Sequence, residues 1–288
     1  MIDMSQFVAL ILTHNRADNV KTYKTLRRSG YTGAIRLVVD DLDPAQKLYE
    51  KNFPGEVVLF SKEQIAHSFD RGDNFNDLRG IFYARNACFD IAADLNFKWF
   101  IELDDDYTFF SWRFNSKNQY LPSGPRVLSL DVVFYHLIEF FENTSIKTIA
   151  LSQGGDWIGG ADSTTSNKMF LHRKAMNSFI CSTERRFQFI GRVNEDVNTY
   201  VKKGSTGDLF FSTNQLSLTQ VTTQKSKGGM TSIYQQSGTY VKSFYSVLYH
   251  PSSVTISSMG DKHPRLHHRI DWTATTPKII SEQYRKVA

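Results

Sequence analysis

Three consecutive aspartates, Asp104–Asp106, have the clearest potential for chemistry in this sequence. They follow the apolar run Trp99–Leu103, which is typical of a buried β-strand. Neighbouring carboxylates repel one another, so a folded protein holds them with a cation or with raised pKa values. Mg²⁺ and Mn²⁺ prefer carboxylate and phosphate oxygens as ligands. A solvated acidic turn is the alternative, but the strand before it favours a site where a cation joins the aspartates to a diphosphate.

The elements that must position these aspartates alternate between strands and helices in the first half of the chain. Strands are expected at Val8–Leu12, Ile35–Val39, Val57–Phe60 and Trp99–Leu103, and helices at Asn19–Arg28, from Asp43 to Asn52 and at Leu78–Leu95. This alternation predicts an α/β fold with a mostly parallel sheet flanked by helices. Ligands of such sheets bind beyond the carboxyl ends of the strands. Three polar clusters should therefore meet at one edge: Asn15-Arg16, Asp40-Asp41 and Asp104–Asp106.

The second half of the sequence is less regular. A helix is expected at Leu130–Phe141, a strand at Thr148–Leu151, strands at Phe187–Ile190 and Leu209–Ser212 on either side of a helix at Glu195–Lys202, and an aromatic-rich helix near Tyr240–Tyr249. No internal repeat or linker-like segment interrupts the pattern. We therefore expect a single domain over residues 1–288 with an elaborated C-terminal half.

Several other side chains suit a nucleotide-dependent reaction. Asp40 or Asp41 could accept hydrogen bonds from a ribose or a base, and one of them also suits a helix cap. The guanidinium groups of Arg85 and Arg16 could meet phosphate or the acidic cluster, although surface arginines are commoner.

Acidic and basic residues nearer the C-terminus could complete such a site. Asp196, beside Glu195 at a helix start, could act as a general base, although the helix dipole alone also favours carboxylates there. His263 or His268 could complete the metal shell, and Lys262 could neutralise a leaving phosphate.

Composition narrows the class of protein only slightly. The net charge of +5 and the pI near 9.0 suit a polyanionic partner, but they are also common in proteins without one. Cys88 and Cys181 form no disulfide framework or CxxC site, the N-terminus does not resemble a leader, and no apolar run is long enough for a bilayer. We therefore expect a cytoplasmic protein without a membrane segment.

The motifs resemble the core of GT-A glycosyltransferases, and more narrowly the TET-associated glycosyltransferases of phages. The core resemblance rests on Ala9–Arg16, Val38–Asp41, Tyr83–Ala87 and Phe100–Tyr107. The narrower one rests on the ordered stretches YARNACFDIA, FIELDDDYT, GGDWIGG, GRVNEDVNTY, KGGMTSIY, SGTYVKSFYSV and MGDKHPRLHH, which together cover nearly the whole chain from Thr13 to His268.

The resemblance implies a GT-A-like, Rossmann-type enzyme that transfers a sugar, with glucose expected, from a UDP-sugar to 5-hydroxymethylcytosine in double-stranded phage DNA. It implies Mn²⁺ or Mg²⁺ as cofactor, the host-cell cytoplasm as location, a nucleotide-binding half at about residues 1–110 and an acceptor-binding half at about 111–288. Carried over to this sequence, it implies nucleotide-sugar contacts at Thr13, Asn15, Arg16, Asp40, Asp41, Arg85, Asp104, Asp105 and Lys262; metal ligands at Asp104, Asp106 and His263 or His268; and a catalytic acid at Asp196 with Glu195 beside it.

Other functions stay open at this point. The acceptor could be a protein or glycan hydroxyl, or the chain could be a non-catalytic nucleic-acid-binding module. Nucleotidyl transfer ranks last, because THNRADN lacks the glycine-rich turn that follows the first strand in such enzymes. On a DNA acceptor, base extrusion is expected, with Phe, Tyr or Trp157 stacking on the base. Hydroxymethyluracil as acceptor base, the stereochemical outcome, the DNA sequence preference and the oligomeric state stay undetermined.

Overall fold

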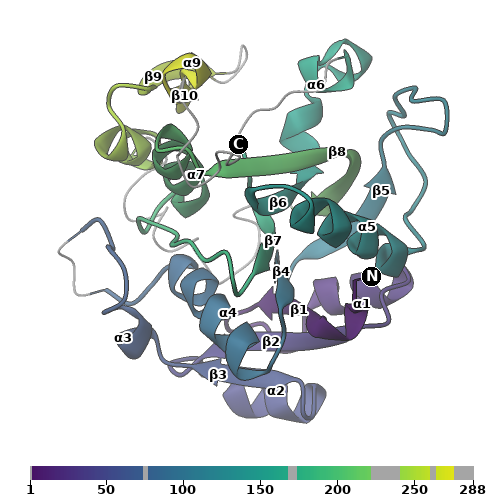
Figure 1. Ribbon diagram of the computed structural model, residues 1–288. Helices are drawn as coiled ribbons and strands as arrows, with labels where there is room; N and C mark the ends of the chain where they lie inside the picture. Colours follow the sequence, from purple (N-terminus) through teal and green to yellow (C-terminus); the bar gives the residue numbers. More distant parts are fainter. Residues whose placement is uncertain (1, 74–76, 168–173, 222–240, 260–263, 276–288) are drawn as a thin grey trace, which may run out of the picture.

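The computed structural model describes residues 2–73, 77–167, 174–221, 241–259 and 264–275 (Figure 1). Eight strands in this part of the chain form one sheet in the order β3-β2-β1-β4-β7-β6-β8-β5, and two more form a small second sheet. The strands of the large sheet are β1 (Phe7–Leu12), β2 (Ala34–Asp40), β3 (Val57–Phe60), β4 (Trp99–Asp104), β5 (Tyr107–Trp112), β6 (Ile146–Gln153), β7 (Ser178–Ser182) and β8 (Leu209–Gln220), and those of the small sheet are β9 (Val254–Met259) and β10 (Arg265–Ile270).

The helices connect and cover these strands. They are α1 (Lys21–Arg28), α2 (Gln46–Asn52), α3 (Lys62–Ile65), α4 (Phe82–Asp94), α5 (Leu130–Glu142), α6 (Thr164–Asn167), α7 (Glu195–Ser205) and α9 (Trp272–Thr275), with helical residues at 241–249 and short 3₁₀ turns η1 (Met4–Gln6), η2 (Gly154–Trp157) and η3 (Gly160–Asp162). None of the described helices has both the length and the apolar character needed to cross a membrane.

The sheet is parallel in its first half and mixed as a whole. β1 pairs in parallel with β2 and β4, and β2 pairs in parallel with β3, as the alternation of strands and helices predicts. β7 is antiparallel to both β4 and β6, β6 is parallel to β8, and β5 is antiparallel to β8. The α/β class is confirmed, with the antiparallel pairs confined to the elaborated part.

The central strands are buried on both faces because helices cover each side of the sheet. Along β1, Phe7, Ala9 and Ile11 face one core cluster, whereas Val8, Leu10 and Leu12 face the other. The first cluster includes side chains of α1, α2 and α5, and the second includes side chains of α4 and α7. Figure 1 shows α4 and α7 on one side of the sheet and α1 and α5 on the other. A strand with period-two alternation therefore presents its side chains to two different sets of helices.

Several sequence expectations need correction. Phe187–Ile190 is not a strand, because Phe187 and Phe189 pack into the core around Phe89 and Phe179 without a ladder partner. The strands β5, β7, β9 and β10 were not foreseen. Conversely, β3 spans the predicted residues Val57–Phe60, and α1 ends where Gly30 was expected to stop it. Gly30 has φ +79°, and a Cβ there would lie 2.2 Å from the carbonyl oxygen of Leu128, so only glycine fits.

The connection between β4 and β5 brings the acidic turn to a seam in the sheet. Only Asp105 and Asp106 separate the two strands, although β7, β6 and β8 lie between them in the sheet order. Such a short link requires the sheet to curl until its far edge approaches β4. Helix α1 holds this seam: Thr22 Oγ1 donates to the carbonyl oxygen of Asp104 at 2.5 Å, and Thr25 Oγ1 donates to that of Tyr107 at 2.9 Å.

Candidate active site

The ends of β1, β2 and β4 bring the three predicted polar clusters to one edge of the sheet. Leu12 is in register with Val38 on one side and with Asp104 on the other, and all three strands point the same way. Residues 13–16, 40–43 and 104–106 therefore follow one another across this edge. The expected convergence is confirmed, and it results from the parallel pairing of the first half.

The middle aspartate of the acidic turn is fully occupied by contacts from the loop after β1. Arg16 Nη1 donates to Asp105 Oδ1 at 2.7 Å, and Thr13 Oγ1 donates to Asp105 Oδ2 at 2.7 Å. Tyr49 of α2 lies behind them, with its hydroxyl 2.7 Å from Thr13 Oγ1 and accepting from the Arg16 backbone N–H at 2.8 Å. Burial raises the pKa of the Asp105 carboxyl, although Arg16 and Thr13 oppose that shift. Asp105 is thus placed to fix the turn.

The first aspartate belongs to a buried ion network on the opposite face of β4. Asp104 and Glu102 are two residues apart and so face the same side, toward α4 and α7. Arg85 of α4 is 1% exposed and donates to Asp104 Oδ1 at 3.2 Å, Glu102 Oε2 at 3.5 Å and Glu195 Oε1 at 3.0 Å. Its guanidinium also lies over the ring of Phe179. Arg85 is therefore committed to carboxylates inside the protein and is not presented to solvent.

Negative charge outweighs positive charge around the turn. Burial raises the pKa of Asp104 to about 7 and that of Glu102 to about 8, with Arg85 opposing both shifts. The pKa of Asp106 is also raised, by burial first and then by repulsion from Asp105. Asp106 Oδ1 and Glu102 Oε1 are buried and have no hydrogen-bond partner within the described residues. These carboxyl oxygens are therefore short of positive charge, which a cation can supply.

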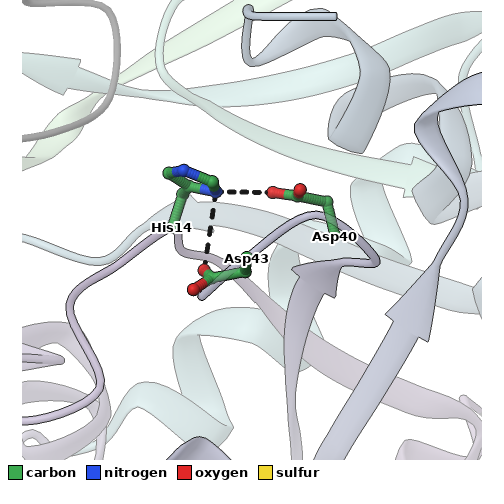
Figure 2. A group of neighbouring side chains, drawn as sticks. All are labelled: His14, Asp40 and Asp43. Carbon is green, nitrogen blue, oxygen red and sulfur yellow. Dashed lines mark hydrogen bonds and ion pairs between the residues drawn. The ribbon is translucent and has the colours of Figure 1, made fainter. Parts of the chain in front are cut away.

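A second group with metal-ligand character lies at the ends of β1 and β2. His14 Nδ1 is 2.6 Å from Asp40 Oδ2 and 3.5 Å from Asp43 Oδ2, and Figure 2 shows both carboxylates in contact with this one ring nitrogen. This is the one group of three His, Cys, Asp or Glu side chains in the described residues whose ligand atoms all lie within 4.8 Å.

The carboxylates of this second group have protein partners that balance their charge without an ion. Lys62 Nζ contacts Asp40 Oδ2 at 3.0 Å, and Asp43 accepts the backbone N–H groups of Asn15 and Ala45 at 2.7 Å each. Burial opposes ionisation of Asp40, but the hydrogen bond from His14 and the charge of Lys62 outweigh it and hold the pKa of that carboxyl below its ordinary value. Asp40 is ionised and positioned, whereas Asp41 is exposed and, among the described residues, its side chain accepts the Lys62 backbone N–H at 3.3 Å and no other.

The predicted catalytic acids open α7 next to the Arg85 network. Glu195 is paired with Arg85, and burial raises its pKa together with repulsion from Asp196. Asp196 is 7% exposed and forms no ion pair within the part of the chain that the structure describes; its Oδ1 accepts the backbone N–H of Val197 at 2.7 Å. Asn194 precedes them in the left-handed region and donates to the carbonyl oxygen of Lys242.

Of the predicted histidine ligands and Lys262, the structure describes only His268, which has no contact with the acidic turn within the described residues. His268 is on β10, where burial and the neighbouring His267 lower its pKa to about 3, and its ligand atoms form no three-member group with Asp104 and Asp106. Lys262 and His263 fall between the described ranges 241–259 and 264–275.

Trp157 does not fit the expected stacking role. Its side chain is 6% exposed, its indole N–H donates to Ser152 Oγ at 3.1 Å, and its ring stacks on Tyr120 with centroids 5.4 Å apart. The guanidinium of Arg113 lies 5.3 Å from the ring centroid. The indole is therefore buried among protein groups, which argues against its stacking on a base, and stacking by Phe or Tyr stays a prediction.

Other residues of the site were missed from the sequence. The C-terminal end of β6 lies at the same edge as the acidic turn, because β7 is antiparallel to both β4 and β6. There Asn177 donates to Gln153 Oε1 at 2.9 Å and accepts from the Tyr107 hydroxyl at 2.6 Å through its carbonyl oxygen. The unforeseen members of the edge are His14, Tyr49, Lys62, Glu102, Tyr107, Gln153 and Asn177. Only Glu102 carries a visible signal, as a charged residue inside an apolar strand.

Comparison with known proteins places this site in context. Among solved structures, the chain is similar to glucosyl-3-phosphoglycerate synthase from Mycobacterium tuberculosis in complex with Mg²⁺ and uridine-diphosphate, at 10% identity over 92% of this chain and 87% of the other, with a TM-score of 0.47. It is also similar to a mannosyltransferase from Pyrobaculum calidifontis in complex with GDP-Man and Mn²⁺, at 10% identity over 77% of this chain and 58% of the other, with a TM-score of 0.49. No curated protein matches the sequence. The family model "TET-Associated Glycosyltransferase" matches residues 7–229 and includes the whole acidic edge, so this protein belongs to the TET-associated glycosyltransferase family, as its motifs led us to expect.

Proposed function

We propose that this protein is a metal-dependent glycosyltransferase that moves glucose from a UDP-sugar to 5-hydroxymethylcytosine in phage DNA. Family membership supports sugar transfer, and the name of the family links it to enzymes of modified DNA bases. The observation that carries the metal and donor part is the charge imbalance at the acidic turn. Five carboxyl groups, those of Glu102, Asp104–Asp106 and Glu195, share two guanidinium groups, those of Arg16 and Arg85, and burial raises the pKa of all five.

The residues of the turn fit a hard divalent cation. Asp106 Oδ1 lacks a partner within the described residues, and Asp104 is 20% exposed at the edge of the sheet. Carboxylate oxygens of this kind are the ligands that Mn²⁺ and Mg²⁺ prefer. Asp104 and Asp106 would hold the ion, with His263 or His268 as a further proposed ligand. Bound there, the ion supplies positive charge to a departing nucleoside diphosphate.

The loops after β1 and β2 are proposed to bind the nucleoside of the donor. Asp40 is held ionised by His14 and Lys62, so it can accept hydrogen bonds from a ribose or a base. Thr13, Asn15 and Asp41 lie beside it at the same edge, and Lys262 is proposed to act on the leaving phosphate. Arg16, Arg85 and Asp105 are proposed to contribute by fixing the acidic turn, because Arg16 contacts Asp105 and Arg85 contacts Asp104.

An acid at the start of α7 is proposed to activate the acceptor. Glu195 is occupied by Arg85, whereas Asp196 forms no ion pair among the described residues and can take a proton from a hydroxyl group. The acceptor hydroxyl then attacks the anomeric carbon of the sugar, the bond from that carbon to the diphosphate breaks, and the proton passes to Asp196. Residues 1–110 would thus bind the donor and residues 111–288 the acceptor.

A DNA acceptor sets further demands on the protein. The hydroxymethyl group of a stacked base lies in the major groove of the duplex. To reach the acidic turn at the edge of the sheet, the base has to leave the helical stack. Hydroxymethylated DNA and nucleotide sugars occur together in the cytoplasm of an infected cell, which we propose as the location of this enzyme.

Release of UDP from UDP-glucose, with and without hydroxymethylated DNA, tests this function. We expect Mn²⁺-dependent UDP release that increases with hydroxymethylated duplex but not with the same unmodified duplex, and that is lost in Asp106→Asn. Mass spectrometry of the nucleosides should show a hexose added to hydroxymethylcytosine. UDP release that responds only to a protein or glycan acceptor would overturn the DNA assignment, and a Mn²⁺-dependent Asp106→Asn enzyme would overturn the metal assignment.

A further inference from the structure

The outer face of α1 carries a row of cations. The helix has the sequence KTYKTLRR and contains no acidic residue. Lys21, Lys24 and Arg28 are separated by three and four positions, so they lie on one face of the helix. Thr22, Thr25 and Leu26 project from the side of the helix that packs against the protein and are buried. The hydrophobic effect therefore orients α1 so that this basic row faces solvent.

None of the three cations is needed for an ion pair in the structure. Lys24 and Arg28 are exposed and Lys21 is half-buried, and none of them contacts a carboxylate in the described residues. Arg27 differs, because its guanidinium donates to the carbonyl oxygens of Tyr31 and Gly33 and lies beside two tyrosine rings. The basic row, defined as Lys21, Lys24 and Arg28, is thus available to an outside anion.

The basic row starts at the acidic turn. The backbone N–H of Thr22, next to Lys21, donates to the carbonyl oxygen of Asp105 at 3.1 Å, and its hydroxyl donates to that of Asp104. From Lys21 to Arg28 the helix rises roughly 10 Å at 1.5 Å per residue. That length matches the axial rise of about three base pairs of duplex DNA at 3.4 Å each. In Figure 1, α1 runs along the side of the sheet next to β1.

We propose that the basic row binds the sugar-phosphate backbone of the duplex that carries the acceptor base, an inference that rests on the proposed function. Charge complementarity and position support this partner. The donor nucleotide is expected at the acidic edge itself, whereas the row extends away from that edge over several phosphate spacings. Contacts of this type position a duplex without reading its sequence, so the row would hold DNA while the target base reaches the acidic turn.

The salt dependence of DNA binding tests this directly. We compare the wild type with a triple variant, Lys21→Gln, Lys24→Gln and Arg28→Gln, on a short hydroxymethylated duplex. Three lost phosphate contacts lower the slope of log K against log salt by about 2.7. Over a fourfold increase in salt, the wild type should lose about 40-fold more affinity than the triple variant. The KM for duplex should rise in the variant, with little change in kcat at saturating duplex.

A second triple variant provides a matched control. Lys147→Gln, Lys202→Gln and Lys203→Gln remove the same charge from the start of β6 and the end of α7, both remote from the acidic turn. This control should keep the wild-type slope, and both variants should keep the wild-type melting temperature. An equal slope in the wild type and the basic-row variant, or an equal loss in both variants, overturns the inference. If instead the wild type transfers no sugar to DNA but acts on a protein or glycan hydroxyl, the proposed function itself fails.

Discussion

Arg16 and Asp105 join the first strand of the sheet to its acidic turn, with Arg16 Nη1 donating to Asp105 Oδ1 at 2.7 Å. Thr13 donates to the other carboxylate oxygen of Asp105. The Tyr49 hydroxyl of α2 is hydrogen-bonded to Thr13 and to the backbone N–H of Arg16. The middle aspartate is therefore bonded within the protein, while Asp106 has an oxygen without a partner in the described residues. Three chemically identical side chains in a row thus have different tasks, which their different partners determine.

Asparagine substitutions should separate these tasks. Asp105→Asn places an amide against Arg16 or Thr13 and leaves a half-buried cation without its carboxylate, so we expect a loss of about 2 kcal/mol in the free energy of unfolding. Asp106→Asn removes a repelling charge, so its metal-free stability should equal or exceed that of the wild type, although its activity is lost. Urea unfolding in EDTA measures both. Equal stabilities for the two variants would contradict the assigned partners.

Addition of Mn²⁺ should stabilise the wild type. A ligand that binds only the folded state at a hundred times its Kd raises the free energy of unfolding by about 2.7 kcal/mol. We expect this gain in the wild type, its reversal by EDTA, and its absence in Asp106→Asn. His14→Gln serves as the control, because His14, Asp40 and Asp43 form the other group with metal-ligand spacing. A gain that survives in Asp106→Asn but disappears in His14→Gln would move the ion to that second group.

The raised pKa values of Asp104 (about 7) and Glu102 (about 8), caused by burial, predict a pH dependence with a definite sign. Between about pH 4 and pH 8 the metal-free folded protein keeps protons that the unfolded chain has lost, so its stability from these groups falls as the pH rises. Mn²⁺ must displace the proton of Asp104 to bind it, so its affinity should increase over the same range. Calorimetry in buffers of different ionisation enthalpy measures the proton release. Mn²⁺ affinity that is flat from pH 5.5 to 8 would contradict these shifts.

The order of elements and the acidic edge could be predicted from the first half of the sequence. Apolar strands followed by amphipathic helices require parallel pairing, and parallel pairing alone brings Asn15, Asp40 and Asp104 to one edge. The strand positions of the second half do not follow from the local sequence pattern. The strand β7 is only five residues long and inserts antiparallel between β4 and β6, a position that depends on tertiary partners and not on local pattern.

The contacts within the site could not be predicted for the same reason. Tyr49 lies in a predicted helix, and Lys62 lies in no element that the sequence predicted. Lys62 reaches Asp40 because β2 and β3 are adjacent, and Tyr49 reaches Thr13 because β1 and β2 are adjacent. Arg85 was expected near phosphate or the acidic cluster, and in the structure it is buried in contact with Asp104 of that cluster. The charged residue Glu102 inside an apolar strand was the available signal for a buried partner.

Arg85→Met should be among the most destabilising single substitutions in the protein. It leaves Glu102, Asp104 and Glu195 without their shared cation, and breaking a buried ion pair in this way costs about 3 to 5 kcal/mol. The matched control is Arg186→Met, which removes the exposed pair between Arg186 and Asp90 of α4 and should cost less than about 1 kcal/mol. Thermal unfolding compares them. Arg85→Lys, which keeps the charge, should recover part of the loss, and equal stability of the two methionine variants would argue against the network.

Asp196→Asn should slow catalysis strongly without weakening donor binding. If Asp196 takes the proton of the acceptor hydroxyl, its loss lowers kcat by about 100- to 10,000-fold, whereas the KM for the UDP-sugar changes little. The matched variant is Glu195→Gln on the same helical turn. Because Glu195 is paired with Arg85, we expect its substitution to lower stability more than kcat. Steady-state kinetics and urea unfolding of the two variants separate the roles. A large kcat loss in Glu195→Gln together with an active Asp196→Asn would assign proton transfer to Glu195, and Arg85 would then orient the base itself.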